Sequence, residues 1–238
     1  MLSNFYQNEM TFEDKLSALI VRCMNSNEKL PTEKEMMEEF SVSRTQLRDA
    51  LATYEACGLL VSQQGSGRYV RQADMSTQIC NMWSLYIKAK PALLVDLLEI
   101  RTLLDIAAIP SVLEKITPQQ LHELSCHVAE MRYKAKQGKT FASNDRAFPQ
   151  VMFSSAGNFL LSQLQSGFWD LYEQFSIETY HEGLEEVAEQ HAQMLEAVAE
   201  KDAAKLEQLM RDQYEDAKQQ IMTFLLNIPN EKHGDGTA

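Results

Sequence analysis

Two arginines one helical turn apart, Arg44 and Arg48, are the residues whose types and spacing suggest chemistry first. They follow Ser43 in the stretch SVSRTQLRDALATYEACGLL, and residues four apart on a helix point to the same side. A guanidinium group can donate two parallel hydrogen bonds to a guanine, which is the commonest specific base contact. The spacing therefore indicates a helix that presents two guanidinium groups to the edges of DNA bases.

The residues around this pair predict the helices that would position it. Thr32 with Glu35, and Ser43 with Gln46, have the spacing of capping boxes and predict the starts of two short helices separated by the turn SVS. Gly58 is placed as the residue that ends the second of them.

Further elements flank this helix pair on both sides. Apolar residues at helical spacing predict another helix over 11–24, and the runs LLVSQ and RYVRQ alternate like strands around the turn QGSG. Helix, helix, turn, helix and hairpin make a winged helix-turn-helix, here over residues 1–72. In such a module the second helix of the pair enters the major groove of DNA.

Other residues of this segment suit the sugar-phosphate backbone. The hydroxyl groups of Ser43 and Thr45, with the free N–H groups of a helix start, match phosphate oxygens. Gly65 and Gly67 would let the backbone of the wing approach the DNA closely, and Arg68 would add positive charge there.

The alternative reading of Arg44 and Arg48 is that they are solvated surface charges paired with Asp49 or Glu55. A single exposed arginine is more often of that kind. The ordered combination of caps, paired arginines, terminal glycine and glycine-rich hairpin favours DNA binding instead.

The charge of the chain is unevenly distributed. The formal net charge is −12, but residues 1–72 hold 8 basic and 10 acidic residues, and residues 41–72 hold 4 basic and 2 acidic ones. An anionic polymer would be tolerated only at this end, because the remainder would repel it.

Composition predicts a mainly α-helical protein of two domains. The chain has 238 residues, 45% of them hydrophobic, with only 9 glycines and 6 prolines. Its four cysteines form no CxxC pair, and neither a signal peptide nor a long apolar segment is evident, so we expect a cytoplasmic protein. Motifs of the GxSxG, Walker or HExxH type are absent, so the sequence offers no basis for an enzyme.

After residue 72 the sequence reads as helices alone. Residues 73–92 predict a connecting segment with helical character, and residues 93–228 predict an all-α bundle of six or seven helices. One break is expected at Pro110, because proline interrupts a helix. Residues 229–238 are expected to be a flexible tail.

The stretch LPTEKEMMEEFSVSRTQLRDALATYEACGLLVSQQGSGRYV resembles the DNA-binding domain of the GntR family of bacterial transcription regulators. The resemblance implies a set of DNA-contacting residues, which are Lys34, Arg44, Thr45, Arg48, Gly65 and Gly67. This sequence departs from the family pattern at two places. Lys34 stands where arginine is usual, and Arg68 stands where threonine commonly follows the second glycine of the wing, so Arg68 would make a contact of its own.

Residues 93–226 resemble the all-helical effector domain of the FadR-like subfamily, the FCD domain, in LLEIRTLLD, NDRAFPQVMFSSAGNFLL and AEQHAQMLEAVAEKDAAKLEQLMRDQ. Many members hold a divalent metal through one Asp and three His. The corresponding positions here are Asp145, Pro149, His191 and Gln213. Two imidazole ligands are missing, so a metal is not expected, although Asp145 and His191 could keep a degraded site. Pro149 should also delay or kink its helix.

The same resemblance implies an effector site without a metal. Arg101 occupies the position of an arginine that often faces the carboxylate of the effector. Its polar partners in the cavity would be Asp145, His191 and Gln213. The alternative is that Arg101 pairs structurally with Glu99 or Asp105.

We therefore expect a homodimeric, ligand-responsive transcription regulator that binds a pseudo-palindromic operator in double-stranded DNA and a small, organic acid-like effector, with no membrane partner. One alternative is a helical interaction protein whose winged helix binds protein. Another, with less support, is an enzyme that uses Asp145 and His191 around a metal.

Overall fold

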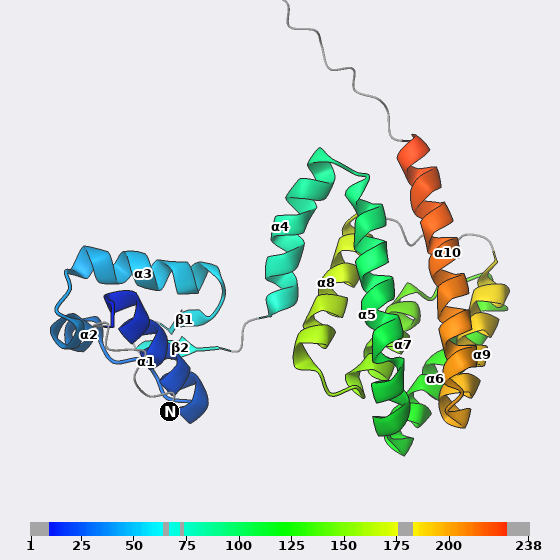
Figure 1. Cartoon of the computed structure of the whole chain (residues 1–238), viewed down its shortest axis with the longest axis horizontal. Coiled ribbons are helices and arrows are strands. Elements are labelled where there is room, and N and C mark those ends of the chain that lie inside the picture. Colours follow the sequence, from blue (N-terminus) through cyan, green and yellow to red (C-terminus); the bar gives the residue numbers. More distant parts are fainter. Residues whose placement is uncertain (1–9, 64–66, 72–73, 176–182, 228–238) are drawn as a thin grey trace, which may run out of the picture. The chain divides into compact units, whose positions relative to one another are not determined.

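The computed structural model describes residues 10–63, 67–71, 74–175 and 183–227. The chain divides into two compact units, Met1–Asp74 and Met75–Ala238, and each unit has its own hydrophobic core (Figure 1). Gly65 of the wing and the expected tail at 229–238 lie outside the described residues.

The described part of the N-terminal unit consists of three helices followed by a hairpin. The helices are α1 (Phe12–Ser26), α2 (Glu33–Phe40) and α3 (Arg44–Ala56), and the strands are β1 (Leu60–Gln63) and β2 (Gly67–Val70). The strands are antiparallel, with Leu60 opposite Val70 and Gln63 opposite Gly67. The predicted winged helix-turn-helix is confirmed.

Local hydrogen bonds set the ends of α2 and α3. Thr32 and Glu35 form a reciprocal capping box at the start of α2, and the Ser43 hydroxyl accepts the backbone N–H of Gln46 at 3.2 Å at the start of α3. Gly58, just after α3, has φ +71°, a left-handed conformation that glycine adopts without steric cost. The starts of both helices and the end of α3 are therefore specified by residues close to them in the sequence.

The core of this unit fixes the orientation of α3. Leu47 and Leu51 of α3 are fully buried, and they lie one turn apart in the same way as the exposed Arg44 and Arg48. The buried apolar residues in the described part of this unit come from α1, α2, α3, β1 and the segment between α1 and α2: Leu16, Leu19, Ile20, Cys23, Leu30, Met36, Phe40, Leu47, Leu51 and Leu60. Burying the leucines therefore leaves the arginines on an adjoining, solvent-facing row of the helix.

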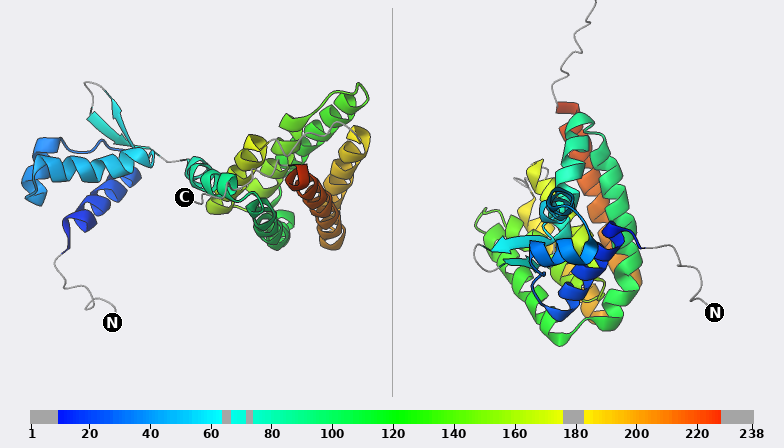
Figure 2. Two further views of the ribbon diagram at one scale, coloured as in Figure 1. Left: turned by 90° about the horizontal axis from the view of Figure 1, so that it is seen from above. Right: turned by 90° about the vertical axis from the view of Figure 1, so that its left-hand side faces the viewer.

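The C-terminal unit is all-α in its described part, which confirms the predicted fold class. Its helices are α4 (Met75–Ala89), α5 (Leu93–Lys115), α6 (Pro118–Ala135), α7 (Ala142–Ser154), α8 (Phe159–Gln174), α9 (Leu184–Glu200) and α10 (Ala203–Asn227). α4 packs along α8, α6 packs on α7 and α9, and α10 packs on α5 and α9. Figure 2 shows α5 and α10 side by side at one edge of the bundle.

Two prolines lie inside helices rather than at their ends. α5 runs through Pro110 without a break, and α7 begins at Ala142, well before Pro149. The expected break at Pro110 and the late helix start at Pro149 are therefore wrong. On either side of Pro110 the residues Ile109 and Val112 are buried, and this packing outweighs the hydrogen bond that proline cannot donate.

Each helix in the described ranges is either too short or too polar to pass through a lipid bilayer.

The core of the N-terminal unit can be tested through α3. Leu51→Ala should lower the free energy of unfolding by about 2–5 kcal/mol, because it removes a fully buried side chain and leaves a cavity. Urea denaturation followed by circular dichroism measures this value. Val21→Ala on α1 is the matched control, since Val21 is 54% exposed, and its effect should stay within about 0.5 kcal/mol. Equal losses in the two variants would contradict the assignment of the core.

Candidate nucleic-acid interface and effector site

The start of α3 presents the two predicted base-reading arginines to solvent. Arg44 is the first residue of the helix, and the side chains of Arg44 and Arg48 are 64% and 57% exposed. The Ser43 hydroxyl caps the N–H of Gln46, and Thr45 is exposed. The helix start thus combines exposed guanidinium groups, hydroxyl groups and the positive end of the helix dipole, which all attract an anion.

The acidic partner of these arginines is Glu33, at the first position of α2. The Nε atom of Arg48 donates to both carboxylate oxygens of Glu33, at 3.1 and 3.2 Å, and the Nε atom of Arg44 lies 3.7 Å from Oε2. The sequence had pointed to Asp49 or Glu55 as partners. Glu33 was missed, although the capping box at Thr32 predicts its place at the first position of α2.

Arg68 of the wing is directed into the domain. Its Nε atom donates to Oε1 of Glu55 at 2.8 Å, its Nη1 atom donates to Oε1 of Glu33 at 3.0 Å, and its side chain is only 22% exposed. The hydroxyl of Ser62 also donates to Glu55, at 2.9 Å. Arg68 therefore links β2 to α2 and α3 through two carboxylates.

These contacts shift the ionisation of all three groups toward their charged forms. Burial raises the pKa of Glu33, but the hydrogen bonds from Arg68 and Arg48 more than offset it, so that this pKa lies below its ordinary value. The Arg68 hydrogen bond lowers the pKa of Glu55. Burial lowers the pKa of Arg68, yet Glu55 and Glu33 raise it further than burial lowers it.

Two further predicted DNA-contacting residues, Lys34 and Gly67, are the sequence neighbours of Glu33 and Arg68. The side chain of Lys34 is 84% exposed and 3.9 Å from Glu38. Gly67 has φ +112°, and a Cβ atom added to it would meet the side chain of Lys29 at 3.8 Å, so the backbone conformation, more than space, requires glycine there.

In the C-terminal unit, Arg101 lies in an aromatic surround rather than in open solvent. Its guanidinium carbon is 4.3 Å from the ring centre of Trp169 and 5.6 Å from those of Tyr172 and Tyr214. The Nε atom is 3.5 Å from a carboxylate oxygen of Asp105. Of the two structural partners considered for Arg101, Asp105 is the one the structure supplies.

Asp105 is the centre of a buried hydrogen-bond network. It is 1% exposed and accepts hydrogen bonds from the hydroxyl of Tyr214 and from Nε2 of Gln165, the latter at 2.7 Å. Burial raises the pKa of Tyr214 well above its ordinary value, and Asp105 raises it further, so the hydroxyl remains a donor. Asp105, Gln165 and Tyr214 were missed as site residues, although Asp105 stands four residues after Arg101 on the same helix.

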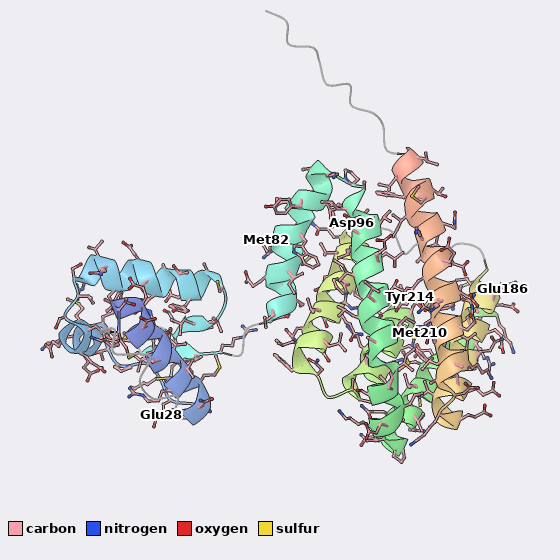
Figure 3. The ribbon with its side chains drawn as sticks, in the orientation of Figure 1. Glu28, Met82, Asp96, Glu186, Met210 and Tyr214 are labelled. Atoms are coloured by element: carbon pink, nitrogen blue, oxygen red, sulfur yellow. The ribbon has the colours of Figure 1, made fainter. Side chains whose placement is uncertain are left out.

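A cavity opens beside this network. It lies between α5 and α10, has a volume of about 380 Å³, and is bounded by Leu98, Glu99, Thr102, Leu103, Arg211, Tyr214, Glu215 and Lys218. Tyr214, labelled in Figure 3, both lines the cavity and donates to Asp105. The side chain of Tyr214 therefore connects the network to a cavity that a small molecule could enter.

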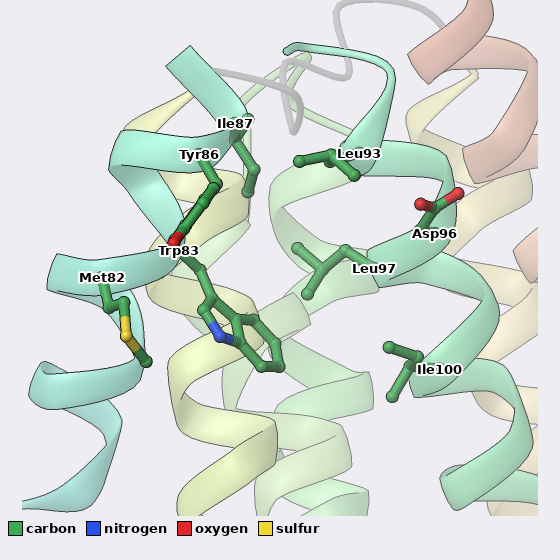
Figure 4. A pocket seen from close by; sticks show the side chains of 8 residues that line it. All are labelled: Met82, Trp83, Tyr86, Ile87, Leu93, Asp96, Leu97 and Ile100. Atoms are coloured by element: carbon green, nitrogen blue, oxygen red, sulfur yellow. The ribbon is translucent and has the colours of Figure 1, made fainter. Parts of the chain in front are cut away.

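A second, more apolar groove of about 310 Å³ lies between α4 and α5 (Figure 4). Trp83 of α4 and Leu97 of α5 point into it from opposite sides, and Asp96 supplies its only acidic side chain. This groove does not contain any residue of the predicted effector site.

Asp145 and His191, the two positions that keep a residue able to bind a metal, form an ion pair with each other. Nε2 of His191 lies 3.0 Å from Oδ1 of Asp145, both side chains are buried, and Nδ1 of His191 donates to the carbonyl of Val187 at 2.9 Å. Pro149 has no ligand atom, and Gln213 on α10 offers only a neutral amide. These residues do not fit the three- or four-ligand site that a transition metal requires.

The same contact sets the charge of His191. Burial lowers its pKa, but the hydrogen bond and charge of Asp145, with the Val187 carbonyl, raise it above the ordinary 6.5. Of the predicted effector residues, Asp145 and His191 contact each other. Arg101 pairs with Asp105 instead, so the predicted residues fall into two separate sets of contacts.

Comparison with known proteins identifies both units. Residues 11–70 match the bacterial regulatory proteins of the gntR family, and residues 96–216 match the FCD domain. The regulator LutR of Bacillus subtilis is 29% identical over 143 residues, which are 60% of this chain and 65% of LutR, so the match covers less than two thirds of that relative. The Uxu operon regulator of Haemophilus influenzae is 26% identical over 219 residues, 88% of this chain and 79% of that protein.

A solved structure supports the fold. The GntR protein of Streptococcus agalactiae superposes with a TM-score of 0.67 at 23% identity, over 87% of this chain and 99% of that one. This similarity concerns the arrangement of the helices and says nothing of a ligand.

The pair of Asp145 and His191 predicts how stability depends on pH. Because the folded chain holds the His191 proton more tightly than the unfolded chain, the stabilisation is fully present below the ordinary pKa and is lost as the pH rises through the raised one. Asp145→Asn should flatten this fall between about pH 6 and pH 8, as measured by urea denaturation with a chelator present. The exposed Asp216→Asn is the control, and a parallel fall in wild type and Asp145→Asn would contradict the assignment.

Proposed function

We infer the function from the family: this chain belongs to the gntR family of bacterial regulatory proteins, carries an FCD domain, and is a DNA-binding transcription regulator rather than an enzyme. We propose that it acts in the cytoplasm as a homodimer on a pseudo-palindromic operator. We further propose that a small organic acid-like effector, bound in the C-terminal unit, changes the affinity for that operator.

The observation that carries this proposal is the pair of exposed guanidinium groups at the start of α3. In a winged helix-turn-helix this helix start meets the base edges of the major groove. Arg44 and Arg48 are exposed there, and both lie near one carboxylate, that of Glu33. A guanidinium held by its Nε atom still carries four N–H donors on its terminal nitrogens, which are the donors that a guanine needs.

The remaining contacts would go to the sugar-phosphate backbone. Lys34, Ser43 and Thr45 are exposed near the same helix start, and Gly67 gives the wing a backbone that can approach DNA closely. Gly65 is proposed for the same role from the sequence. Because most of the net charge of −12 lies outside the first unit, the C-terminal unit should repel DNA, and the proposed contacts all come from the N-terminal unit.

The proposed effector site lies in the cavity beside Tyr214. Arg101 pairs with Asp105, and Asp105 accepts a hydrogen bond from Tyr214, which lines this cavity. A carboxylate of the effector that replaced Asp105 as the partner of Arg101 would gain a charge-assisted hydrogen bond. Asp145, His191 and Gln213 are proposed as further polar residues of the response, because the family resemblance places them in the effector domain.

Effector binding needs only a modest free energy to control DNA binding. A coupling of about 1–3 kcal/mol between two sites changes affinity several-fold to a hundredfold. An effector that favours one spacing of the two DNA-binding units in the dimer would supply this coupling free energy. The Uxu operon regulator, similar over 88% of this chain, bears a name that supports an operator as the target.

Removing either arginine should relax the base preference at the position that this arginine reads. Arg44→Ala and Arg48→Ala should each weaken binding by about 10- to 100-fold, the value of one bidentate guanine contact, on a duplex selected from a random library by the wild-type protein. Fluorescence anisotropy measures the affinity, and sedimentation checks that the oligomer is unchanged. Arg22→Ala, an exposed arginine of α1, is the control. Unchanged base preferences in both variants would remove the basis of this proposal.

The effector site can be tested without leaving a buried charge unpaired. The double variant Arg101→Gln with Asp105→Asn removes both members of the ion pair, so the fold should survive. Small mono- and dicarboxylic acids that raise the thermal midpoint of the wild type should leave this variant unchanged. Arg132→Gln with Glu189→Gln removes an exposed ion pair as the control. A full thermal shift in the Arg101 variant would place the effector elsewhere.

A further inference from the structure

The wing arginine Arg68 shares a carboxylate with the base-reading helix. Glu33 is 17% exposed and receives Nη1 of Arg68 on Oε1 and Nε of Arg48 on both oxygens. Glu55 of α3 holds the Nε atom of the same Arg68 at 2.8 Å. A continuous chain of charged hydrogen bonds therefore runs from Glu55 through Arg68 and Glu33 to Arg48.

This geometry leaves Arg68 poorly placed to bind a phosphate. Its side chain is 22% exposed, and two of its three nitrogens donate to carboxylates inside the domain. A phosphate would have to compete with two charged acceptors that are already in contact. By comparison, the side chains of Arg44 and Arg48 are each more than half exposed.

We propose that Arg68 is a positioning residue for base readout. By holding Glu33 and Glu55 from the wing, it fixes the Glu33 carboxylate beneath α3, and this carboxylate orients the guanidinium of Arg48 toward the DNA. The proposal rests on the proposed reading of bases by Arg48. It gives the wing a role in choosing bases that does not require contact between Arg68 and DNA.

Charge balance explains why a cation is needed at this place. Glu33 and Glu55 repel each other, because the negative charge of Glu33 raises the pKa of Glu55. Without Arg68, the largely buried carboxylate of Glu33 would have Arg48 and Arg44 as its remaining cationic partners. Both guanidinium groups would then be drawn toward the protein and away from the bases.

The test is the base preference of full-length variants at each position of the selected duplex. Arg68→Gln should weaken binding to the selected duplex about tenfold, the effect of one charged hydrogen bond, and should relax preference at the same base pair as Arg48→Ala. The slope of affinity against salt should stay that of the wild type, because no phosphate contact is lost. Arg71→Gln, an exposed arginine at the end of the wing, is the matched control and should relax no position.

A second variant keeps the charge and guards against loss of folding. In Arg68→Lys a single ammonium group cannot hold two carboxylates in the fork geometry of a guanidinium, so preference at the Arg48 position should still relax. A phosphate contact would instead tolerate lysine.

Either of two results overturns the role of Arg68. One is a salt slope reduced by about one in Arg68→Gln with all base preferences intact, which would make Arg68 a phosphate contact. The other is unchanged preference in both variants. If the wild type enriches no sequence from the library, the proposed function itself falls and takes this role with it.

Discussion

A single carboxylate, that of Glu33, joins α2, α3 and the wing of the N-terminal unit. It stands at the first position of α2, beside the start of α3, and receives hydrogen bonds from Arg48 of that helix and Arg68 of the wing. A carboxylate surrounded by several guanidinium groups remains charged and directs each of them. The Arg48 guanidinium at the start of α3 is thus held by an acidic residue that would itself repel DNA if it stood alone.

In the interior of the C-terminal unit, a single carboxylate likewise contacts side chains from several helices. Asp105 on α5 pairs with Arg101 on its own helix, and it accepts hydrogen bonds from Gln165 on α8 and Tyr214 on α10. Removing one partner of such a buried pair leaves a charge without compensation, which costs far more than the pair contributes. A ligand that competed for one member would therefore disturb three helices at once, which is how the proposed effector would act on the bundle.

Local sequence patterns predicted the elements well but not the contacts between them. Caps such as Thr32 with Glu35 and the apolar spacing of Leu47 and Leu51 depend on neighbours in the chain, so they can be recognised directly. Glu33 meets Arg68 across 35 positions and Asp105 meets Tyr214 across 109, and no local period encodes such pairs. The predicted helix break at Pro110 was wrong for a related reason, because the tertiary packing of α5 overrides the local preference of proline.

The central claim is that guanidinium groups at the start of α3 read guanines in the major groove, and methylation of guanine N7 tests it most directly. A duplex selected by the wild-type protein is methylated sparsely, and bound and free fractions are compared at each guanine. We expect methyl groups at particular guanines to block the wild type, and those same positions to lose their effect in Arg44→Ala or Arg48→Ala. Interference at no guanine, or an identical pattern in both variants, would contradict the account.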